Sequence, residues 1–469
     1  MKRTVLSLLV LSLALVPATA FAAANNDTTT AAPTFYQDVL PVLQENCQVC
    51  HRPNGANLGG MVAPMAFTSY QDTRPWAKSI AKRVEAREMP PWHASPEFAD
   101  VFVNERTLTD NQIATLVRWS KTGAPAGDIA DAPPTKEWPA NDGWTIGEPD
   151  LVLNFGPKYF VEDDVEDLYI GFTTEITEEM LPEPRWMKAV EFRPGTPVVH
   201  HIIAAPLGGI APGNQATVHN DGFATLLKPG TTIRWQMHYH KEPGEGTGVW
   251  DQSSAAIRFY PEGYEPDYRV LSDPLAKMDF EIPAGDPNYS ATVTTTFKRD
   301  TLVLGYLPHM HLRGKSAHYV AKYPDGTEEV LLDVPDYDFN WQTLYEYPAE
   351  GKLMPAGTQI ELTMAWDNSA DNPSNPDPTE TVRFGRPTTS EMMFGFVSYV
   401  DAEKGYVPPE GAGFFGGGQR RQIDPERLKA IIKDRFGLDW DSMTEEEQQE
   451  LMQRFRGGRN RDTGNSSGQ

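Results

Sequence analysis

The sequence predicts a multidomain chain: a small all-α domain, two all-β antiparallel, jelly-roll-like sandwiches, and a short C-terminal helical tail. Its 469 residues suffice for about three domains. Helical periodicity is confined to the two ends of the chain, whereas the middle alternates short β-rich runs with turns. The 38 glycines and 40 prolines also suit a loop-rich β protein.

Residues 1–22 have the pattern of a cleavable secretory signal. A basic start precedes an apolar run over 5–16, and Ala20-Phe21-Ala22 supplies a small-residue cleavage site. No later stretch approaches ~18 consecutive apolar residues, so we expect an exported protein, periplasmic or secreted, without a membrane span. The formal net charge of −24 argues against a nucleic-acid partner.

Segment 34–130 is expected to form the helical domain. We predict helices over 38–46, 75–88 and 109–123. The second should end before Pro90, because proline cannot continue a helix. The third opens with a Thr-x-x-Gln capping box and carries apolar residues at helical spacing.

Cys47-Gln48-Val49-Cys50-His51 has the spacing of a c-type haem attachment motif. In such a motif the two thiols bind the haem as thioethers and the adjacent imidazole becomes an axial iron ligand. The alternative is a thioredoxin-like redox pair, which would need a βαβ context. The helical flanks favour one covalently attached haem.

Met89 is the predicted sixth ligand of the haem iron, since it lies at a rigid turn just after a helix. A thioether opposite histidine raises the haem potential, which suits an electron carrier. Met61, Met65 and His93 are the alternatives. The third predicted helix resembles the closing helix of class I cytochromes c, and that resemblance implies a cytochrome c-like domain.

The β region divides into segments 143–290 and 291–402 and contains three groups of histidines. The first is His200-His201 within an apolar run. Adjacent residues of a regular strand face opposite ways, so only one of the two is expected to bind a metal. Both could bind the same metal only if the strand were bulged.

The second group lies in the run 233–240, where apolar and polar residues alternate. Ile233 begins the apolar face, whereas His238 and His240 share the polar face with two other residues. A polar face on an otherwise aromatic strand is suited to a metal ligand at a cleft. The spacing leaves open which of the two histidines binds.

The third group is His309-Met310-His311, which follows an apolar run typical of a buried strand. Alternation places the two imidazoles on one face and Met310 on the other. Met392, at the start of a later strand, offers a thioether. Imidazole with thioether is a copper ligand set, and zinc is less suitable because no thiolate is left for it.

Taken together, the order of these motifs resembles the copper type II, ascorbate-dependent monooxygenases (the peptidylglycine α-hydroxylating and dopamine β-monooxygenase-like family). The order is His-His, Met-His-Tyr within a strand, His-x-His, then Glu-Met opening a strand, over about residues 145–402. The run Trp366 to Pro373 also resembles this family's second domain.

The resemblance implies two copper ions. One, which supplies electrons, would be held by three histidines, and the other, which binds dioxygen and substrate, by two histidines and a thioether. The implied ligands are His200, His201 and His238 for the first copper and His309, His311 and Met392 for the second.

Two features depart from the family pattern. Family members contain several disulfides, whereas the only cysteines here are those of the haem motif. The peptide-amidating members bind a substrate carboxylate at positions that Leu307, Phe394 and Phe396 occupy in this chain. An apolar substrate is therefore favoured over a glycine-extended peptide.

Segment 403–469 is predicted to be a Gly-rich linker and two short helices, the first starting near Asp424 and the second near Thr444.

The functional hypothesis is a copper-containing monooxygenase that hydroxylates a C–H bond of a small molecule with O2. The fused haem would supply electrons from a small reductant or redox protein. The alternative is a non-catalytic haem and copper electron-transfer or copper-handling protein.

Overall fold

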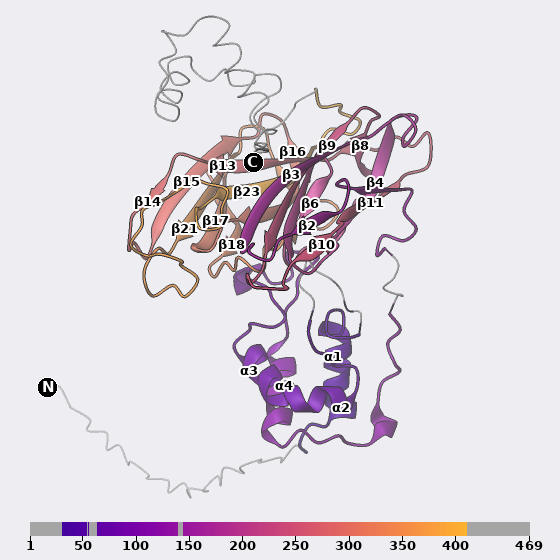
Figure 1. Cartoon of the computed structure of the whole chain (residues 1–469), viewed down its shortest axis with the longest axis vertical. Helices are drawn as coiled ribbons and strands as arrows, with labels where there is room; N and C mark the ends of the chain where they lie inside the picture. The colour runs from indigo at the N-terminus through magenta and orange to yellow at the C-terminus, as the bar shows by residue number, and fades with distance from the viewer. Residues whose placement is uncertain (1–30, 54, 56–62, 139–143, 410–469) are drawn as a thin grey trace, which may run out of the picture.

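The structure is a computed structural model that describes residues 31–53, 55, 63–138 and 144–409. Most of this chain is β-sheet, and a small helical part lies at its N-terminal end, to one side of the sheets (Figure 1). No helix within these residues is long and apolar enough to cross a membrane. The predicted signal, Met61 and the predicted tail helices lie outside the described residues.

The helical part contains three longer elements and several single turns. These are η1 Phe35–Val39, α1 Leu40–Asn46, α2 Tyr70–Thr73, η2 Arg74–Trp76, α3 Ala77–Glu85, η3 Pro96–Phe98, α4 Asp110–Lys121 and η4 Ile129–Asp131. Helices α1, α3 and α4 enclose a small core in which Leu43, Leu116 and Trp119 are fully buried.

The ends of these helices test the predicted boundaries. The Thr109 and Gln112 capping box is present at the start of α4, as predicted. The prediction that the second helix reaches residue 88 was wrong, because α3 ends at Glu85. Arg87 has a φ of 55°, a left-handed conformation that no α-helix accommodates, so the chain leaves the helix before it reaches Pro90.

The first sandwich follows the helical part. Its strands are β1 Leu151–Asn154, β2 Tyr159–Val161, β3 Asp167–Glu175, β4 Arg185–Arg193, β5 Val199–Ala205, β6 Gly208–Ile210, β7 Thr217–Val218, β8 Phe223–Leu227, β9 Thr232–His240, β10 Val249–Asp251, β11 Ser254–Phe259 and β12 Tyr268–Arg269. One sheet has the order β1-β11-β4-β8-β12 with β7 beside β4, and the other β3-β9-β5-β6. Apolar side chains of both sheets form one core, including Phe192 and Ile257 from one and Ile202 and Trp235 from the other.

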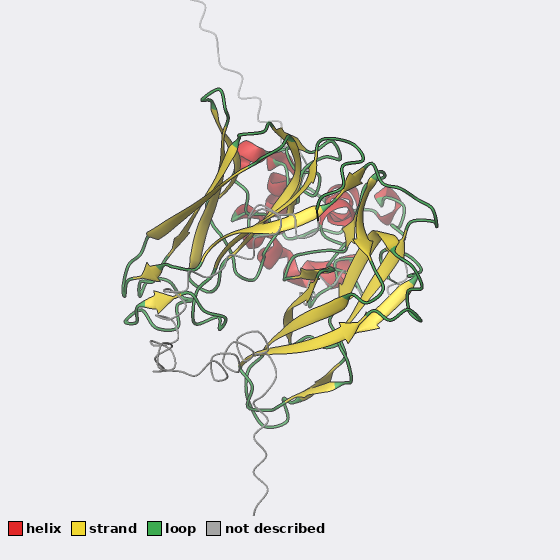
Figure 2. Ribbon diagram, turned by 90° about the horizontal axis from the view of Figure 1, so that it is seen from above, coloured by secondary structure: helices red, strands yellow, loops and turns green. Residues whose placement is uncertain are grey.

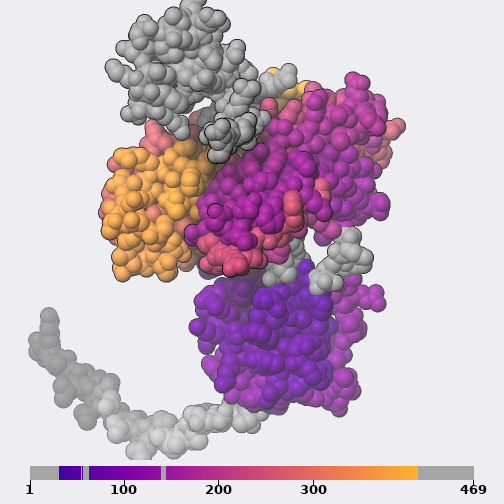
Figure 3. All heavy atoms as spheres, in the orientation of Figure 1, coloured from indigo at the N-terminus to yellow at the C-terminus, as the bar shows by residue number. Residues whose placement is uncertain are grey.

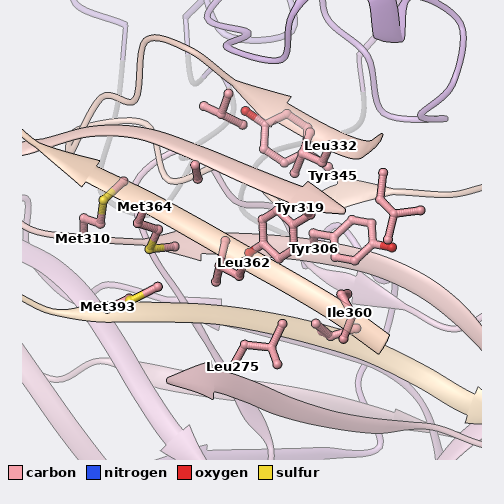
Figure 4. Packing of buried hydrophobic residues seen from close by; sticks show 14 of the residues in the cluster. Leu275, Tyr306, Met310, Tyr319, Leu332, Tyr345, Ile360, Leu362, Met364 and Met393 are labelled. Carbon is pink, nitrogen blue, oxygen red and sulfur yellow. The ribbon is translucent and has the colours of Figure 1, made fainter. Parts of the chain in front are cut away.

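The second sandwich is built in the same way. Its strands are β13 Leu271–Lys277, β14 Glu281–Ile282, β15 Tyr289–Thr296, β16 Thr301–His309, β17 Gly314–Lys322, β18 Glu328–Val334, β19 Tyr345–Glu346, β20 Lys352–Met354, β21 Gln359–Trp366, β22 Val382–Arg383 and β23 Met393–Asp401. The sheets β13-β23-β16-β19 and β15-β21-β17-β18 enclose a core rich in tyrosine and methionine, part of which is drawn in Figure 4. Figure 2 shows the strands of the two sandwiches side by side.

The change from one sandwich to the other falls earlier than the predicted boundary at 290. Strand β12 pairs with β8 of the first sandwich, whereas β13 pairs along its whole length with β23 of the second. Strand β14 pairs with β22. The transition therefore lies between Arg269 and Leu271, a position that depends on long-range strand pairing.

One stretch of the helical part packs onto the second sandwich. Phe98 and Phe102 are buried in the core of that sandwich and not in the helical core. The backbone N–H of Val103 donates to the carbonyl of Glu346 at 2.9 Å, and that of Ser95 to Asp333 at 2.8 Å. Segment 92–104 thus attaches the helical part to the β part, and the space-filling view shows the two in contact (Figure 3).

Candidate metal centre

His200, His201 and His238 converge at the end of the first sandwich, and they are called the first histidine set below. Strands β5 and β9 pair His201 with His238, and the register shifts between Val199 and His201. This irregularity is a local bulge of β5, and without it His200 and His201 would point to opposite faces of the strand. One nitrogen from each of the three imidazoles lies within 4.8 Å of the others.

The geometry of the first histidine set fits a metal ion. Nδ1 of His201 lies 3.1 Å from Nδ1 of His238. Two nitrogens at the usual bond length to a tetrahedral metal are about 3.3 Å apart. Both ring nitrogens of His200 are buried without a hydrogen-bond partner among the described residues. Burial lowers the pKa of His200 to about 3, which keeps its imidazole neutral and able to bind a metal.

The structure distinguishes the two histidines of β9. His238 is fully buried within the set. The side chain of His240 is 54% exposed and its Nδ1 lies 3.9 Å from Asp167. His238 is buried because Tyr169 lies opposite it on β3 and stacks on its imidazole ring. His240 lies at the end of the β3–β9 ladder.

Asp167 and Tyr169 are contacts of His238 that the sequence analysis missed. Nε2 of His238 is hydrogen-bonded to the carboxylate of Asp167, which leaves Nδ1 directed toward His201. The ring of Tyr169 stacks on His238 at 4.0 Å. An aspartate that orients a histidine is a common second partner at metal sites. Their Asp-x-Tyr spacing puts both on one face of β3. The β3–β9 register pairs Tyr169 with His238 but Asp167 with His240, so the bond between Asp167 and His238 is set by side-chain packing.

His309 and His311 form the second histidine set, at the end of β16 and in the turn that follows it. Their ring centroids are 5.3 Å apart. His309 Nδ1 pairs with Oε1 of Gln342 at 2.7 Å, and His311 Nδ1 with the carbonyl of Ser390 at 3.1 Å. Since both acceptors require an N–H at Nδ1, each Nε2 is left as the free lone pair. Nε2 of His311 is buried without a partner in the described chain.

The two methionines near this set lie on opposite faces. Met310 is fully buried in the core of the second sandwich, so the prediction that it points away from the histidines is confirmed. Figure 4 shows its side chain in the core together with that of Met393. Strand β23 pairs Phe394 with His309, and Met392 directly precedes this strand. Alternation along β23 puts Met392 on the face that carries Phe394 and not on the face of Met393.

A buried carboxylate, that of Glu391, is hydrogen-bonded to the backbone of the turn that contains His311. Glu391 accepts hydrogen bonds from the backbone N–H groups of His311 at 2.9 Å and Arg313 at 2.7 Å, and from the indole of Trp366 at 3.0 Å. Burial raises the pKa of Glu391 to about 7 against the effect of these donors. The buried guanidinium of Arg313 donates to Asn368 at 2.8 Å, so part of the run 366–373 holds the turn that contains His311.

The two histidine sets face each other across the junction of the sandwiches. The ring centroids of His201 and His309 are 6.3 Å apart. Asp167 of β3 also accepts a hydrogen bond from the hydroxyl of Thr388 at 3.0 Å, four residues before Met392. A metal bound at one set would therefore lie close to a metal bound at the other.

An apolar wall lies next to His309. Phe394 stands across from His309 at 6.3 Å between ring centroids, and Phe384 and Phe396 each lie 6.0 Å from Phe394. Leu307 pairs with Phe396 in the same ladder. All four side chains are half-buried. The structure thus gathers these apolar side chains beside His309, and the apolar substrate stays a prediction.

Both cysteines and the histidine of the predicted haem motif line a separate cavity of about 360 Å3, here called the Cys47 cavity. Its volume is within the ~300–1,000 Å3 range of small-molecule sites. Cys50, His51, Met65 and Met89 also line it, whereas His93 does not. Met89 thus remains the predicted sixth ligand, with Met65 as an alternative that also lines the cavity and Met61 as one outside the described residues.

The chemistry of the Cys47 cavity suits haem better than a redox disulfide. His51 Nδ1 pairs with the carbonyl of Met65 at 3.3 Å, which leaves Nε2 for an iron. Burial raises the pKa of Cys47 to about 12, opposite to the activated thiolate of a thiol–disulfide enzyme. Arg106 lines the cavity with a guanidinium that also donates to the carbonyl of Gly213 at 3.1 Å. Such a cation complements the carboxylates of a haem.

Comparisons with known proteins give no family assignment. No protein-family profile matches the chain, and no curated protein matches it. Solved structures with some similarity include the VP2 subviral particle of infectious bursal disease virus, at 11% identity over 66% of this chain and 94% of that chain, with a TM-score of 0.14. The Gt strain of the same virus gives 12% identity over 65% and 90%, with a TM-score of 0.16. Similarity this weak supports no inference.

Proposed function

We propose that this protein is a copper-dependent monooxygenase that hydroxylates a C–H bond of a small apolar molecule with O2. The observation that carries the proposal is the meeting of two histidine sets at the junction of two β-sandwiches. Both ring nitrogens of His200 and Nε2 of His311 are buried there without a hydrogen-bond partner among the described residues. The motif order that resembles the copper type II monooxygenases supports the same function.

Each of the two histidine sets would bind one copper ion, and the two coppers would have different roles. Copper would supply one-electron redox chemistry at both sets and dioxygen binding at the second. His200, His201 and His238 provide three neutral imidazoles and no thioether, a set that suits both copper oxidation states. In the second set, His309 and His311 each have Nδ1 occupied by a hydrogen bond, so their Nε2 atoms and the thioether of Met392 would hold the other copper. The thioether of Met392 would favour Cu(I), the state that reacts with dioxygen.

The half-buried wall of Leu307, Phe384, Phe394 and Phe396 would position the substrate. Aromatic and aliphatic side chains bind an apolar molecule by removing its surface from water. With substrate bound against them, they would also exclude bulk water from the second histidine set. A substrate that depends on a carboxylate for binding would find no cation among these four residues.

The helical part would be the c-type cytochrome domain expected from the sequence. Haem in the Cys47 cavity would supply electrons one at a time. Cys47 and Cys50 would attach it, His51 would bind the iron through Nε2, and Met89 would be its second axial ligand.

Metal analysis of the purified full-length protein is the first test. The proposal requires two copper ions and one haem per chain. A preparation that contains haem but takes up no copper contradicts it, because the histidines would then be structural.

Replacement of Met392 tests the assignment of the oxygen-binding site. Met392→Ile should reduce hydroxylation, followed as labelled oxygen in the product across a panel of apolar substrates, by at least an order of magnitude. Reduction of the haem by ascorbate should be unchanged, because the Cys47 cavity is separate. Met278→Ile is the matched control, since Met278 is 59% exposed. Full turnover by the Met392 variant contradicts the assignment, and copper and haem without any oxygen incorporation would favour the electron-transfer alternative.

A further inference from the structure

The loop between β18 and β19 contacts both histidine sets and the Cys47 cavity. Trp341 lines the cavity together with Cys50 and His51. Two residues earlier, the ring of Phe339 stacks on His200, with centroids 4.6 Å apart and an angle of 16° between the planes. One residue later, Gln342 holds Nδ1 of His309 at 2.7 Å. Residues 338–342 are called the bridging loop below.

The bridging loop is held in place by hydrogen bonds. The N–H of Trp341 donates to the carbonyl of Asp338 at 2.9 Å, and the N–H of Gln342 to that of Pro212 at 2.9 Å. Nε2 of Gln342 donates to the carbonyl of Phe339 at 3.1 Å. Gln342 is 1% exposed. These contacts fix the three side chains relative to one another.

The helical part is fixed against the same region. Arg106, which lines the Cys47 cavity, donates to the carbonyl of Gly213 at 3.1 Å. A Cβ on Gly213, whose φ is 94°, would lie 3.0 Å from the ring of Trp341. Only glycine therefore lets the chain 211–214 approach Trp341 this closely, and the cavity and the bridging loop are held together.

We propose that the bridging loop is the route by which single electrons pass from the Cys47 cavity to the histidine sets, with Trp341 as the residue on the cavity side. This inference rests on the proposed function, since it requires haem and copper at the two places. Covalent bonds lead from Trp341 to Gln342, and one hydrogen bond leads on to His309. A second branch leads through Phe339 and its stacked ring to His200. Connected bonds and stacked rings transmit an electron better than an equal length of empty space.

The transfer involves one electron and no atom. The haem iron passes from Fe(II) to Fe(III), and copper bound by the histidines passes from Cu(II) to Cu(I). A small-molecule reductant such as ascorbate returns the iron to Fe(II). Trp341 is a positioning residue in this scheme, because it binds neither metal.

The test measures internal electron transfer without turnover. Full-length protein carrying haem and Cu(II) is kept anaerobic, its haem is photoreduced by a flash, and haem reoxidation is followed by absorbance. Loss of the Cu(II) signal is followed in freeze-quenched samples by electron paramagnetic resonance. Trp341→Leu should slow both changes by at least an order of magnitude, and Trp341→Phe should restore part of the rate because it keeps an aromatic ring.

Trp250→Leu is the matched control. Trp250 is 60% exposed on β10 of the first sandwich and belongs neither to the lining of the Cys47 cavity nor to the bridging loop. Its replacement should leave the transfer rate unchanged. An unchanged rate in Trp341→Leu, or an equal loss in Trp250→Leu, would overturn the proposed route. A protein that binds no copper or no haem would instead refute the proposed function before the route is tested.

Discussion

At the scale of single residues, the candidate metal centre depends on which imidazole nitrogen is left free. In the second histidine set, Gln342 and the carbonyl of Ser390 each occupy an Nδ1. In the first set, Asp167 occupies Nε2 of His238 instead and leaves its Nδ1 beside that of His201. These partners decide ring orientation and tautomer, so they would contribute to the affinity for a bound metal without contacting it.

Asp167 is the residue for which this effect is most easily measured. Asp167→Ala should weaken copper binding at the first histidine set by roughly 10–100-fold, because the ring of His238 loses its orientation. Competition titration with a copper chelator measures the change. Thr388→Val is the control: it removes the hydroxyl that donates to Asp167 but leaves the bond to His238. An equal loss in both variants would show that the contact between the sandwiches, and not the orientation of His238, controls affinity.

At the scale of elements, the ends of β16 and β23 position the second histidine set. His309 is the last residue of β16, and Met392 directly precedes β23, which pairs with β16 in antiparallel register. The carboxylate of Glu391 accepts hydrogen bonds from the backbone N–H groups of His311 and Met392, and it thereby joins the two segments. The site therefore relies on one buried carboxylate to hold two chain segments that are about eighty residues apart in sequence.

Replacement of this carboxylate should destabilise the metal-free protein. Glu391→Gln substitutes an NH2 for one of the two accepting oxygens and leaves at least one buried N–H unsatisfied. The expected cost is roughly 1–3 kcal/mol in the free energy of unfolding, measured by denaturant titration. Glu281→Gln is the control, because Glu281 forms an ion pair with Arg383 in which both side chains are more than half exposed. Its effect should stay within about 1 kcal/mol. Equal effects would mean that the Glu391 contacts contribute little.

At the scale of the whole molecule, segment 92–104 joins the helical part to the second sandwich. Phe102 lies 5.5 Å from Tyr345 and 5.2 Å from Tyr347 between ring centroids, and together with Phe98 it is buried in the core of the second sandwich. Burial of these rings removes apolar surface from water and resists separation of the two parts. The proposed electron route needs such an attachment, since Trp341 belongs to the sandwich and Cys50 to the helical part.

Truncation of Phe102 should loosen this attachment. Phe102→Ala removes a ring that is 3% exposed, at a cost of about 3–5 kcal/mol, so segment 92–104 should be cut faster in limited proteolysis. Val103→Ala, next to it in sequence but 65% exposed, should leave the cleavage rate unchanged. Resistance of the Phe102 variant to cleavage would show that other contacts hold the two parts together.

The sequence by itself determined what depends on spacing along one strand or helix. The Cys-x-x-Cys-His motif, the capping box at Thr109 and the opposite faces of His309 and Met310 follow from local geometry, and the structure agrees with the last two. The β-rich middle of the chain also follows from its short alternating runs. These features need no knowledge of distant contacts.

Only the tertiary structure decided what depends on pairing between distant segments. The bulge after Val199 brings both neighbouring histidines to one site, and the β3–β9 register buries His238 while leaving His240 exposed. The boundary near Arg269, the role of Asp167 and the place of Trp341 beside the Cys47 cavity have the same origin. Register and loop placement are fixed by burial and hydrogen bonding summed over whole sheets, which no local pattern contains.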